Sequence, residues 1–485
     1  MKLKRVKLTR LMSASIIMLL LSACFGDSDD TEQHSQDDNS YAYTPQDIHE
    51  AYNLNAFYDL GFYGKGKVIV LIDAYGSQTA EADLDVFHDT YFSDFDEPDF
   101  KQIFPDNVSP DYDDDVADFW AEETSLDIQW SYAIAPNATI HVVVAQSEAP
   151  TDYLSALEYI IENYSSGTVV SMSFSLPEED LGEIAINDIE TQFEKGIEKG
   201  LTFFASSGDL GSTNQQTEST QDNQPSVNYP ASSVYVTAVG GTFLQYGWTW
   251  TPTSDEPYLD YDSSTGEGTV KNPDYFSYSR HLFVKRRVEA MWNEAWIPSA
   301  TGGGVSEYIP MPEWQSDNAF VNEVITNNEN GLAAMRGIPD LSWSAAKFGG
   351  VYIYVNGTWM VVGGTSASSP QTAGFMSLVN EYLSNQGLDN MGYLNQWLYQ
   401  MSDVDNNDSG ESAFNDIKPL TFGTDIAAGE LSNNVLFEFN SDGSVSPGST
   451  LGYSVADGWD LTTGFGSPNS IYFAEALATL MSESD

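Results

Sequence analysis

Short runs of apolar, largely β-branched residues alternate with helical periods over the first half of the chain, and this alternation restricts the fold more than any other feature. The apolar runs cover residues 67–72, 138–145, 169–174 and 201–205, and helical periods cover residues 84–91, 118–133, 154–163 and 184–199. Continuous apolar runs are typical of strands that are buried on both faces of a parallel sheet. The pattern predicts an α/β fold, a doubly wound parallel sheet with helices on both faces.

The N terminus has the pattern of an export signal. Basic residues precede an apolar stretch at residues 11–23, which is too short for an ordinary membrane span. The stretch ends in Leu21-Ser22-Ala23-Cys24, which resembles a bacterial lipobox. We expect residues 1–23 to be a lipoprotein signal peptide, Cys24 to be lipidated and residues 24–40 to be an acidic flexible tether. The alternative is a plain signal peptide that is cleaved near Ala23.

The predicted signal defines where the protein would work. We expect an exported protein that is lipid-anchored at the cell envelope, or one that is extracellular. Phe25 follows the cysteine and favours the outer membrane over the inner one. Cys24 is the only cysteine, so the chain has no intrachain disulfide and no cysteine-based zinc site.

The composition limits the partners of the protein. The chain has 72 acidic residues against 18 basic ones, and its formal net charge is −54. Such an excess of negative charge repels nucleic acid and anionic membranes. We therefore expect no nucleic-acid partner, contact with a membrane only through the lipid anchor, and a monomer.

The residues after the tether contain no internal repeat, and we expect residues 41–485 to form one large domain. Two segments within it lack a sustained period. Residues 243–290 are rich in Tyr, Trp, Asp, Ser and Pro, and residues 421–452 are rich in Gly, Ser, Asn and Asp. We interpret both segments as surface insertions.

The strongest local motif runs from Gly363 to Pro370 and contains Ser366. It follows an apolar run at residues 360–362 and precedes a helix that is predicted over residues 371–383. A serine at such a strand-to-helix turn lies at the positive end of the helix dipole, where it can serve as a nucleophile. A serine that caps the helix would give the same local pattern. The motif by itself leaves both interpretations open.

A nucleophilic serine needs a base, and no histidine has a suitable setting. The five histidines are His34, His49, His88, His141 and His281. None of them lies in a His-Gly-Thr motif, His34 lies in the tether, and His141 lies at the start of a predicted buried strand.

Carboxylates offer the alternative base. Glu123 and Asp127 are four residues apart, which places them on one face of a helix. In a cleft, such a pair retains a proton to higher pH and can relay it. On a solvated face, the pair would have no such role.

Asp209 follows the apolar run at residues 201–205, within Ala205-Ser206-Ser207-Gly208-Asp209. A carboxyl group at the end of a buried strand can stabilise an oxyanion if it keeps its proton, because only the protonated form donates a hydrogen bond. An aspartate in an ordinary turn before a helix is the alternative.

These residues and many further segments, between Tyr43 and Ala474, resemble the sedolisin family of serine-carboxyl peptidases. The further segments are Ala133-Ile134-Ala135-Pro136-Asn137-Ala138, Ser171-Met172-Ser173-Phe174, Tyr229-Pro230-Ala231-Ser232-Ser233, Gly302-Gly303-Gly304-Val305-Ser306, Arg336-Gly337-Ile338-Pro339-Asp340-Leu341-Ser342, Phe414-Asn415-Asp416-Ile417 and Gly458-Trp459-Asp460. The resemblance implies a subtilisin-like fold.

The resemblance also implies a role for each candidate residue. Ser366 would be the nucleophile, Glu123 the general base and acid, Asp127 the residue that orients Glu123, and Asp209 the oxyanion acid. Asp73 matches a position at which some members carry an acidic residue linked to the catalytic network, and we assign it a secondary role.

The same resemblance implies one structural calcium ion. Asp416 and Asp460 would supply carboxylates, and the carbonyl groups of Ile417, Ala456 and Gly458 would complete the shell. Oxygen ligands suit this cation. The segment between Ile417 and Ala456 is longer than is usual in the family.

The function that follows as an expectation is an endopeptidase that cleaves proteins or peptides at acidic to mildly acidic pH. A tripeptidyl exopeptidase on the same scaffold and a catalytically weak surface-binding lipoprotein are the alternatives. Phe174 and Ser175 stand where tryptophan and glycine are common in the family, so we expect a different substrate groove. Family precursors usually carry a long N-terminal prodomain, and from the short tether we expect no prodomain and no autoprocessing.

Overall fold

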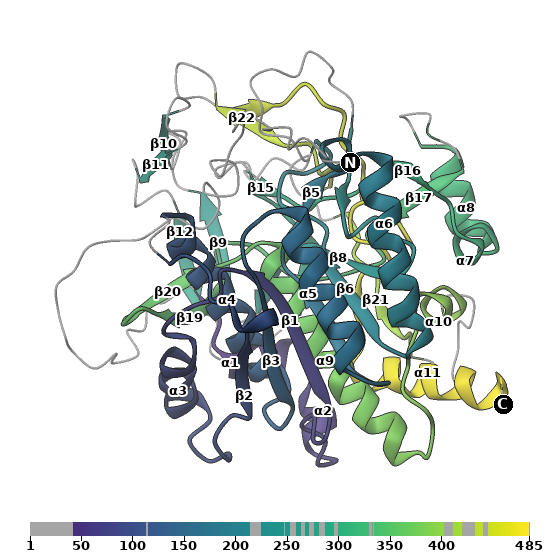
Figure 1. The fold of residues 1–485 in the computed structure, drawn as a ribbon. Helices are drawn as coiled ribbons and strands as arrows, with labels where there is room; N and C mark the ends of the chain where they lie inside the picture. Colours follow the sequence, from purple (N-terminus) through teal and green to yellow (C-terminus); the bar gives the residue numbers. More distant parts are fainter. Residues whose placement is uncertain are drawn as a thin grey trace, which may run out of the picture.

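A computed structural model places a mostly parallel β-sheet at the centre of the molecule (Figure 1). The structure describes residues 42–112, 115–213, 225–246, 248–252, 259–262, 267–270, 276–280, 287–294, 299–328, 332, 334–401, 411–419, 432–439 and 445–484. The predicted signal peptide, Cys24 and the tether lie outside the described residues. Within the described ranges, no helix is long and apolar enough to cross a membrane.

The strands of the central sheet are β1 (Val68–Ala74), β2 (Phe100–Ile103), β3 (Thr139–Ala145), β4 (Val169–Met172), β6 (Thr202–Ser206), β8 (Val236–Tyr246), β13 (Arg287–Met291) and β18 (Leu341–Ser344). The shorter pairs are formed by β5 (Leu176–Pro177), β7 (Asn228–Tyr229), β9 (Trp248–Pro252), β10 (Leu259–Asp262), β11 (Glu267–Val270), β12 (Phe276–Arg280), β14 (Asn293–Glu294), β15 (Ser299–Ala300), β16 (Gly304–Pro310), β17 (Met335–Ile338), β19 (Val351–Val355), β20 (Thr358–Val362), β21 (Phe414–Asn415), β22 (Phe437–Phe439), β23 (Val445–Pro447) and β24 (Ser467–Pro468).

The α-helices are α1 (Pro45–Ala51), α2 (Asn55–Tyr58), α3 (Ala80–Tyr91), α4 (Asp115–Ile134), α5 (Pro150–Asn163), α6 (Glu178–Glu198), α7 (Glu313–Ser316), α8 (Ala319–Thr326), α9 (Thr365–Asn385), α10 (Leu394–Met401) and α11 (Ser470–Ser484). A short 3₁₀ turn, η2, covers Pro105–Asn107.

The order of the strands confirms the predicted parallel sheet. The strands follow each other as β13-β8-β6-β4-β1-β3-β2, and β18 also pairs with β8. All neighbours run parallel except β13, which is antiparallel to β8. The chain adds β2 and β3 on one side of β1 and then crosses over to add β4, β6 and β8 on the other side. Sites in such sheets lie at the carboxyl ends of the strands near this change of direction.

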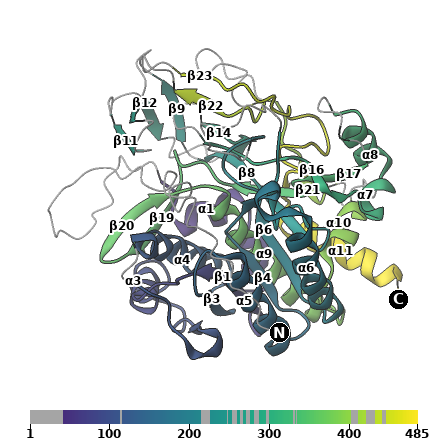
Figure 2. The ribbon, with the colours of Figure 1, turned by 45° about the horizontal axis from the view of Figure 1, so that its top comes forward.

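Helices cover both faces of the sheet (Figures 1 and 2). Helices α4 and α9 pack against each other on one face, and α5 and α6 pack on the other. Alternate residues of β1 enter the two cores, since Ile69 and Leu71 belong to one apolar cluster and Val70 and Ile72 to the other. A strand that is buried on both faces needs apolar residues at every position, which explains the continuous apolar run in the sequence.

The predicted elements are present, with shifted boundaries. Strand β4 ends at Met172, so Ser173 and Phe174 lie beyond it, and β1 continues through Asp73 to Ala74. Helix α6 begins at Glu178 and contains a kink at Gly182, where φ is 72°. The helix that was predicted to begin at residue 371 begins at Thr365 instead, because Pro370 is accommodated inside it.

The predicted insertion at residues 243–290 has both of its ends in the central sheet. Residues 243–246 of β8 pair with residues 287–290 of β13, and Phe243 lies opposite Ala290. Between these ends, β9 pairs with β12 and β10 pairs with β11. The second predicted insertion, residues 421–452, is described only in part and contains the β22–β23 pair.

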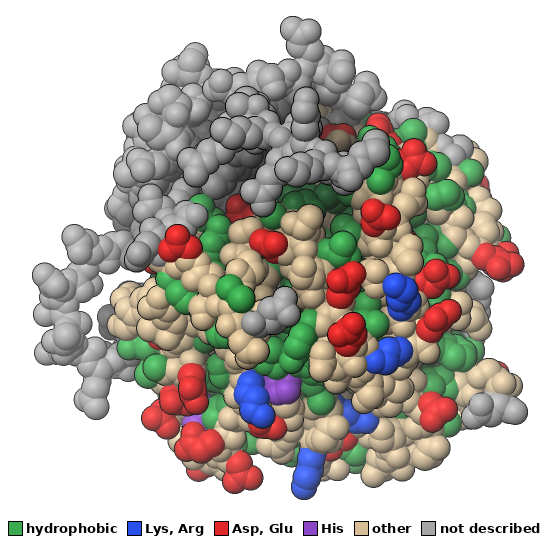
Figure 3. Space-filling view, in the orientation of Figure 1, with side chains coloured by type: hydrophobic (Ala, Val, Ile, Leu, Met, Phe, Trp, Pro, Cys, Tyr) green, Lys and Arg blue, Asp and Glu red, His purple; other side chains and the backbone are tan. Residues whose placement is uncertain are grey.

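Acidic side chains are distributed over the face of the molecule that Figure 3 shows, whereas Lys and Arg lie mainly in its lower half. The negative charge is therefore spread over this surface and is not gathered in one patch. This distribution agrees with a protein that repels polyanions.

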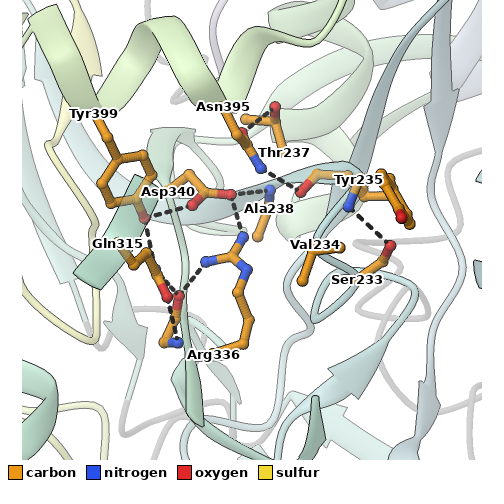
Figure 4. A network of polar contacts seen from close by, with 12 residues as sticks. Ser233, Val234, Tyr235, Thr237, Ala238, Gln315, Arg336, Asp340, Asn395 and Tyr399 are labelled. Carbon is orange, nitrogen blue, oxygen red and sulfur yellow. Dashed lines mark hydrogen bonds and ion pairs between the residues drawn. The ribbon is translucent and has the colours of Figure 1, made fainter. Parts of the chain in front are cut away.

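A buried ion pair between Arg336 and Asp340 fixes the segment that leads into β18 (Figure 4). The Nη2 atom of Arg336 lies 2.6 Å from Oδ2 of Asp340, and both side chains are fully buried. The same Oδ2 accepts a hydrogen bond from the backbone N–H of Ala238 (2.7 Å), and Oδ1 accepts one from the hydroxyl of Tyr399 (2.6 Å). This pair therefore ties β8, β17 and α10 to the start of β18.

Candidate active site

Ser366 is the second residue of α9 and lies at the carboxyl edge of the sheet. It is half-buried, whereas its neighbours Thr365 and Ala367 are buried. Two glycines let the chain pass close to other backbone groups just before it. A Cβ atom on Gly363 would lie 2.7 Å from two carbonyl oxygens, and one on Gly364, at φ +107°, would lie 2.5 Å from Oδ2 of Asp209. No other residue type would leave Ser366 in this place.

The first turn of α9 has a free carbonyl group that another segment binds. Pro370 has no N–H, so the carbonyl oxygen of Ser366 lacks its partner four residues along the helix. The hydroxyl oxygen of Ser173, just after β4, lies 3.3 Å from this oxygen. Ser173 therefore connects the end of β4 to the turn that carries Ser366.

Glu123 and Asp127 both project from α4 into the interior, and they are 3% and 0% exposed. The solvated acidic face that the sequence left open is therefore ruled out. Burial, followed by the negative charge of Asp73, raises the pKa of Glu123 well above its ordinary value. The hydroxyl of Ser366 opposes this rise through its contact with the carboxyl of Glu123.

Asp73, at the carboxyl end of β1, joins the two carboxyls of α4. Both of its carboxyl oxygens, Oδ2 of Asp127 and Oε1 of Glu123 are buried without a hydrogen-bond donor among the described residues. The remaining oxygen of Asp127, Oδ1, accepts a hydrogen bond from Ser173 (2.7 Å). Three carboxyls in one buried place cannot all be ionised, so at least one of them keeps a proton.

The direction of the pKa shifts agrees with this shared proton. Burial raises the pKa of Asp73 to about 7, against the opposing effect of contacts with Thr124 and Asp127. The pKa of Asp127 also lies well above its ordinary value, because of burial and then the charges of Asp73 and Glu123. A proton shared between Asp73 and Asp127 would occupy the oxygens that have no other donor.

Asp209 lies in the loop after β6 and contacts the turn that carries Ser366. Its Oδ1 accepts hydrogen bonds from the backbone N–H of Thr365 (2.8 Å) and from the Thr365 hydroxyl (2.7 Å). The Thr365 hydroxyl accepts in turn from the N–H of Gly208 (3.1 Å). The Oδ2 atom of Asp209 faces Gly364, which lies two residues before Ser366. Burial raises the pKa of Asp209, while Lys347 and the two bonds from Thr365 oppose the rise.

The structure thus brings together all four predicted catalytic residues and Asp73, which the sequence placed in four separate segments. The described histidines lie elsewhere. His49 contacts the carbonyl of Ala133 (2.7 Å), His88 contacts Tyr132 (2.6 Å) and His141 contacts Tyr164 (2.7 Å). Within the described part of the chain, no histidine reaches Ser366, and His34 and His281 lie outside it.

Ser173 lies just after an apolar run and inside a motif that the sequence marked, and the structure places it beside Asp127. One functional neighbour was not singled out from the sequence. Lys347 is a buried lysine near Asp209, and nothing in its local sequence distinguishes it from a surface lysine.

An apolar cavity of about 30 Å³ opens beside the residue that follows Ser173. Phe174 and Tyr153 form one wall, with their rings stacked at a centroid distance of 3.7 Å. Other lining residues are Leu176, Leu181 and Tyr229. The cavity lies between α5, α6 and the end of β4, on the side of the sheet away from α9.

The residues that the family resemblance assigned to calcium lie together near the C terminus. The N–H of Gly458 donates to Oδ2 of Asp416 (3.1 Å), and the N–H of Ala456 donates to Oδ2 of Asp460 (2.9 Å). Oδ1 of Asp416 is buried and has no donor. No described residue donates a hydrogen bond to the carbonyl oxygens of Ile417, Ala456 or Gly458.

These oxygens fit a hard cation, because one free carboxylate oxygen and three free carbonyl oxygens gather in one loop cluster. Among the described residues, no three His, Cys, Asp or Glu side chains gather at a metal site, so backbone oxygens would have to supply part of the shell. Lys418 competes for the same carboxylate, since its Nζ lies 3.4 Å from Oδ2 of Asp416.

Comparison with known proteins supports a single family. No family model matches the chain. Kumamolisin from Bacillus sp. (strain MN-32) is 28% identical over 449 residues, covering 92% of this chain and 65% of kumamolisin. Tripeptidyl-peptidase 1 from Mus musculus is 27% identical over 372 residues, covering 74% of this chain and 52% of that protein. The chain therefore spans slightly less than two thirds of one relative and about half of the other.

A solved structure shows the same fold. Pseudomonas sedolisin, described as a serine-carboxyl proteinase and bound to two molecules of pseudo-iodotyrostatin, superimposes with a TM-score of 0.64 at 24% identity. The match covers 90% of this chain and 98% of that one.

Proposed function

The chain belongs to the sedolisin family of serine-carboxyl peptidases, and on this premise we propose that it hydrolyses peptide bonds in proteins or peptides with Ser366 as the nucleophile. The observation that carries the proposal is the convergence of Glu123, Asp127 and Asp209 on Ser366, without a histidine among the described residues. Each of these carboxyls is buried, and burial raises the pKa of each. Such groups can hold and release protons under mildly acidic conditions.

In the proposed reaction, Oγ of Ser366 attacks the carbonyl carbon of the scissile bond and its proton passes to Glu123. The carbonyl oxygen gains negative charge and accepts a hydrogen bond from the protonated Oδ2 of Asp209. Glu123 then returns the proton to the leaving amine as the C–N bond breaks, which leaves an acyl-enzyme. Water hydrolyses this ester in a second step, with Glu123 again acting as base and then acid, and Ser366 is regenerated.

Asp127 and Asp73 would act through Glu123. The hydrogen bond from Ser173 fixes Asp127, and a proton held between Asp127 and Asp73 lowers the charge that Glu123 faces. Glu123 can then be ionised, and so be ready to accept the serine proton, without being a third buried negative charge next to two others.

For the substrate, we propose an extended peptide that carries an apolar side chain on one side of the scissile bond. Phe174 follows Ser173 directly and lines the apolar cavity. A substrate peptide in an extended conformation could form backbone hydrogen bonds with this segment. Alternate side chains of the peptide would then point towards the cavity. The family resemblance favours endopeptidase action, and tripeptidyl exopeptidase action is the second candidate because of the likeness to tripeptidyl-peptidase 1.

A pair of peptides tests the mode of action and the pH range together. We expect a peptide with an acetylated N terminus to be cleaved internally as fast as the free peptide, because an endopeptidase has no need of the terminal amine. We expect the rate to fall as the pH rises, since the raised pKa of Asp209 keeps its donor proton only below that pKa and the proton is lost above it. Rates are measured by mass spectrometry between pH 3 and 9.

Two outcomes would contradict parts of this proposal. Cleavage that requires a free amine and releases three residues at a time would establish the exopeptidase. A rate that stays constant up to pH 9 would remove the role of a protonated Asp209.

We also propose that Asp416, Asp460 and the carbonyls of Ile417, Ala456 and Gly458 hold one calcium ion, which would stabilise the fold. Removing calcium with a chelator should lower the midpoint of thermal unfolding, and added Ca²⁺ should restore it. A ligand at 100 times its Kd contributes about 2.7 kcal/mol. Asp416→Asn should lose this response, whereas Asp457→Asn, an exposed neighbour outside the proposed shell, should keep it. If the midpoint of thermal unfolding changes with neither the chelator nor added Ca²⁺, the proposed calcium site is wrong.

Lipidation of Cys24, export to the cell envelope and the monomeric state remain predictions from the sequence. Mass spectrometry of the mature N terminus would detect the lipid directly.

A further inference from the structure

Lys347 is a buried cation next to the candidate active site, and the proposed reaction does not use it. It lies in the loop between β18 and β19, and the residue is only 9% exposed. This loop packs against Gly363 and Gly364, the turn that leads to Ser366. The N–H of Gly364 donates to the carbonyl of Ala345 (2.6 Å), and a Cβ atom on Gly363 would lie 2.7 Å from Cα of Lys347.

The loop is held in place by a second buried acid. The carboxylate of Glu294 accepts hydrogen bonds from the backbone N–H groups of Lys347 (2.8 Å) and Phe348 (2.8 Å), and from the indole of Trp292 (2.9 Å). Both carboxylate oxygens are used by these donors. Glu294 therefore fixes the backbone of the loop without binding the ammonium group of Lys347 directly.

The ammonium group itself has a neutral partner. Its Nζ donates to the hydroxyl of Ser299 at 3.1 Å. The charged groups that face it are carboxyls from three elements: Asp209 after β6, Glu294 in β14 and Glu123 in α4. Burial lowers the pKa of Lys347 to about 8, and these three acids oppose the change, so Lys347 is charged throughout the acidic range.

We propose that Lys347 is a positioning residue for the oxyanion acid: its buried ammonium favours the ionised form of Asp209 and thereby sets the upper pH limit of peptide hydrolysis. The inference rests on the proposed role of Asp209 as a protonated donor. The segment Ser299-Ala300 connects the two residues, since Ser299 accepts from Nζ of Lys347 (3.1 Å) and the N–H of Ala300 donates to the carbonyl of Asp209 (2.9 Å). Lys347 is also the group with the largest charge effect on Asp209, and the charges of Glu123 and Asp209 act on each other. A positive charge beside a carboxyl stabilises the carboxylate, so the donor proton leaves at lower pH than it would without the lysine.

The test compares the pH dependence of kcat/KM between pH 3 and 9 for wild type and Lys347→Met, on one internally quenched peptide. We expect the alkaline limb of the pH profile of Lys347→Met to move up by about one pH unit, because one buried charge near a carboxyl shifts the pKa of that carboxyl by about this amount. The shift should appear in kcat more than in KM, since the oxyanion exists only in the transition state. Lys347→Arg keeps the charge and should retain the limb of the wild type.

Lys67→Met is the matched control. Lys67 also donates to neutral side chains, Ser384 (2.6 Å) and Asn390 (3.1 Å), but it precedes the opposite end of β1 from Asp73, roughly 20 Å away along the strand. The alkaline limb of the pH profile of Lys67→Met should not move. If Lys347→Met fails to fold, Lys347→Gln provides a second test, because its amide keeps a polar group near Ser299 without the charge. Its limb should also move up.

A limb that stays in place in Lys347→Met, or in Lys347→Gln where that variant replaces it, would overturn the inference, as would an equal shift in Lys67→Met. If the wild type is active and depends on Ser366 but the limb does not move, only the role of Lys347 fails. If hydrolysis does not depend on Ser366, the proposed function fails and the inference falls with it.

Discussion

Replacing Ser366 with alanine is expected to lower kcat/KM for peptide hydrolysis by about 10⁴-fold or more, because the acyl-enzyme route is lost and only binding and oxyanion stabilisation remain. Glu123→Gln should lower it almost as far, since the amide cannot accept the serine proton. The two effects should not add in the double variant, because the residues act as one unit. The measurement is hydrolysis of a denatured protein between pH 3 and 7.

A serine elsewhere on the same helix gives the matched control. Ser377 is buried on α9, and its hydroxyl donates to the carbonyl of Ala373 (3.0 Å). It lies eleven residues after Ser366, roughly 16 Å along the helix. Ser377→Ala should keep its activity within a few-fold of the wild type. If the wild type hydrolyses the substrate no faster than Ser366→Ala, the protein is no serine peptidase and the alternative of a surface-binding lipoprotein gains support.

The second large effect concerns stability. Asp340→Ala should lower the free energy of unfolding by about 3–5 kcal/mol, because it leaves the guanidinium of Arg336 buried and unpaired. It also removes the acceptor for the N–H of Ala238 and for the hydroxyl of Tyr399. Urea denaturation of the purified protein provides the measurement.

A double variant separates the ion pair from the other bonds of Asp340. Arg336→Met combined with Asp340→Ala should recover part of the loss, since the uncompensated charge is gone. The loss should be far greater than that of an exposed pair such as Lys418–Asp457, for which less than about 1 kcal/mol is expected. A single-variant loss below about 1 kcal/mol would show that the pair contributes little.

The local sequence was sufficient to predict the sheet and the candidate nucleophile. Apolar runs and helical periods are short-range patterns, and the buried strands β1, β3, β4 and β6 lie where these runs predict them. The predicted start of α9 was wrong, because Pro370 lies inside the helix and the hydroxyl of Ser173 lies 3.3 Å from the carbonyl oxygen that this proline leaves without its helical donor. The end of β8 was assigned to an insertion because its partner, β13, is about 45 residues further along the chain.

The candidate site, like the fold, could be predicted only in part from the sequence. The sequence alone determined which residue types were available: a serine after two glycines, two carboxyls four residues apart on a helix, and an acid after a buried strand. Ser366 therefore could be proposed as a nucleophile, but a helix cap remained an equal interpretation until Glu123 was found in contact with it and Asp209 with its neighbour Thr365.

Only the tertiary structure decided how these groups are charged. The burial of Asp73 and Asp127 together, the donorless oxygens between them and the ammonium of Lys347 near Asp209 arise where elements more than 40 residues apart pack against each other. A pKa depends on solvent exclusion and on charges within several ångströms, and neither is a property of the local sequence. The sequence thus specified the reacting groups, and packing set the pH at which they can work.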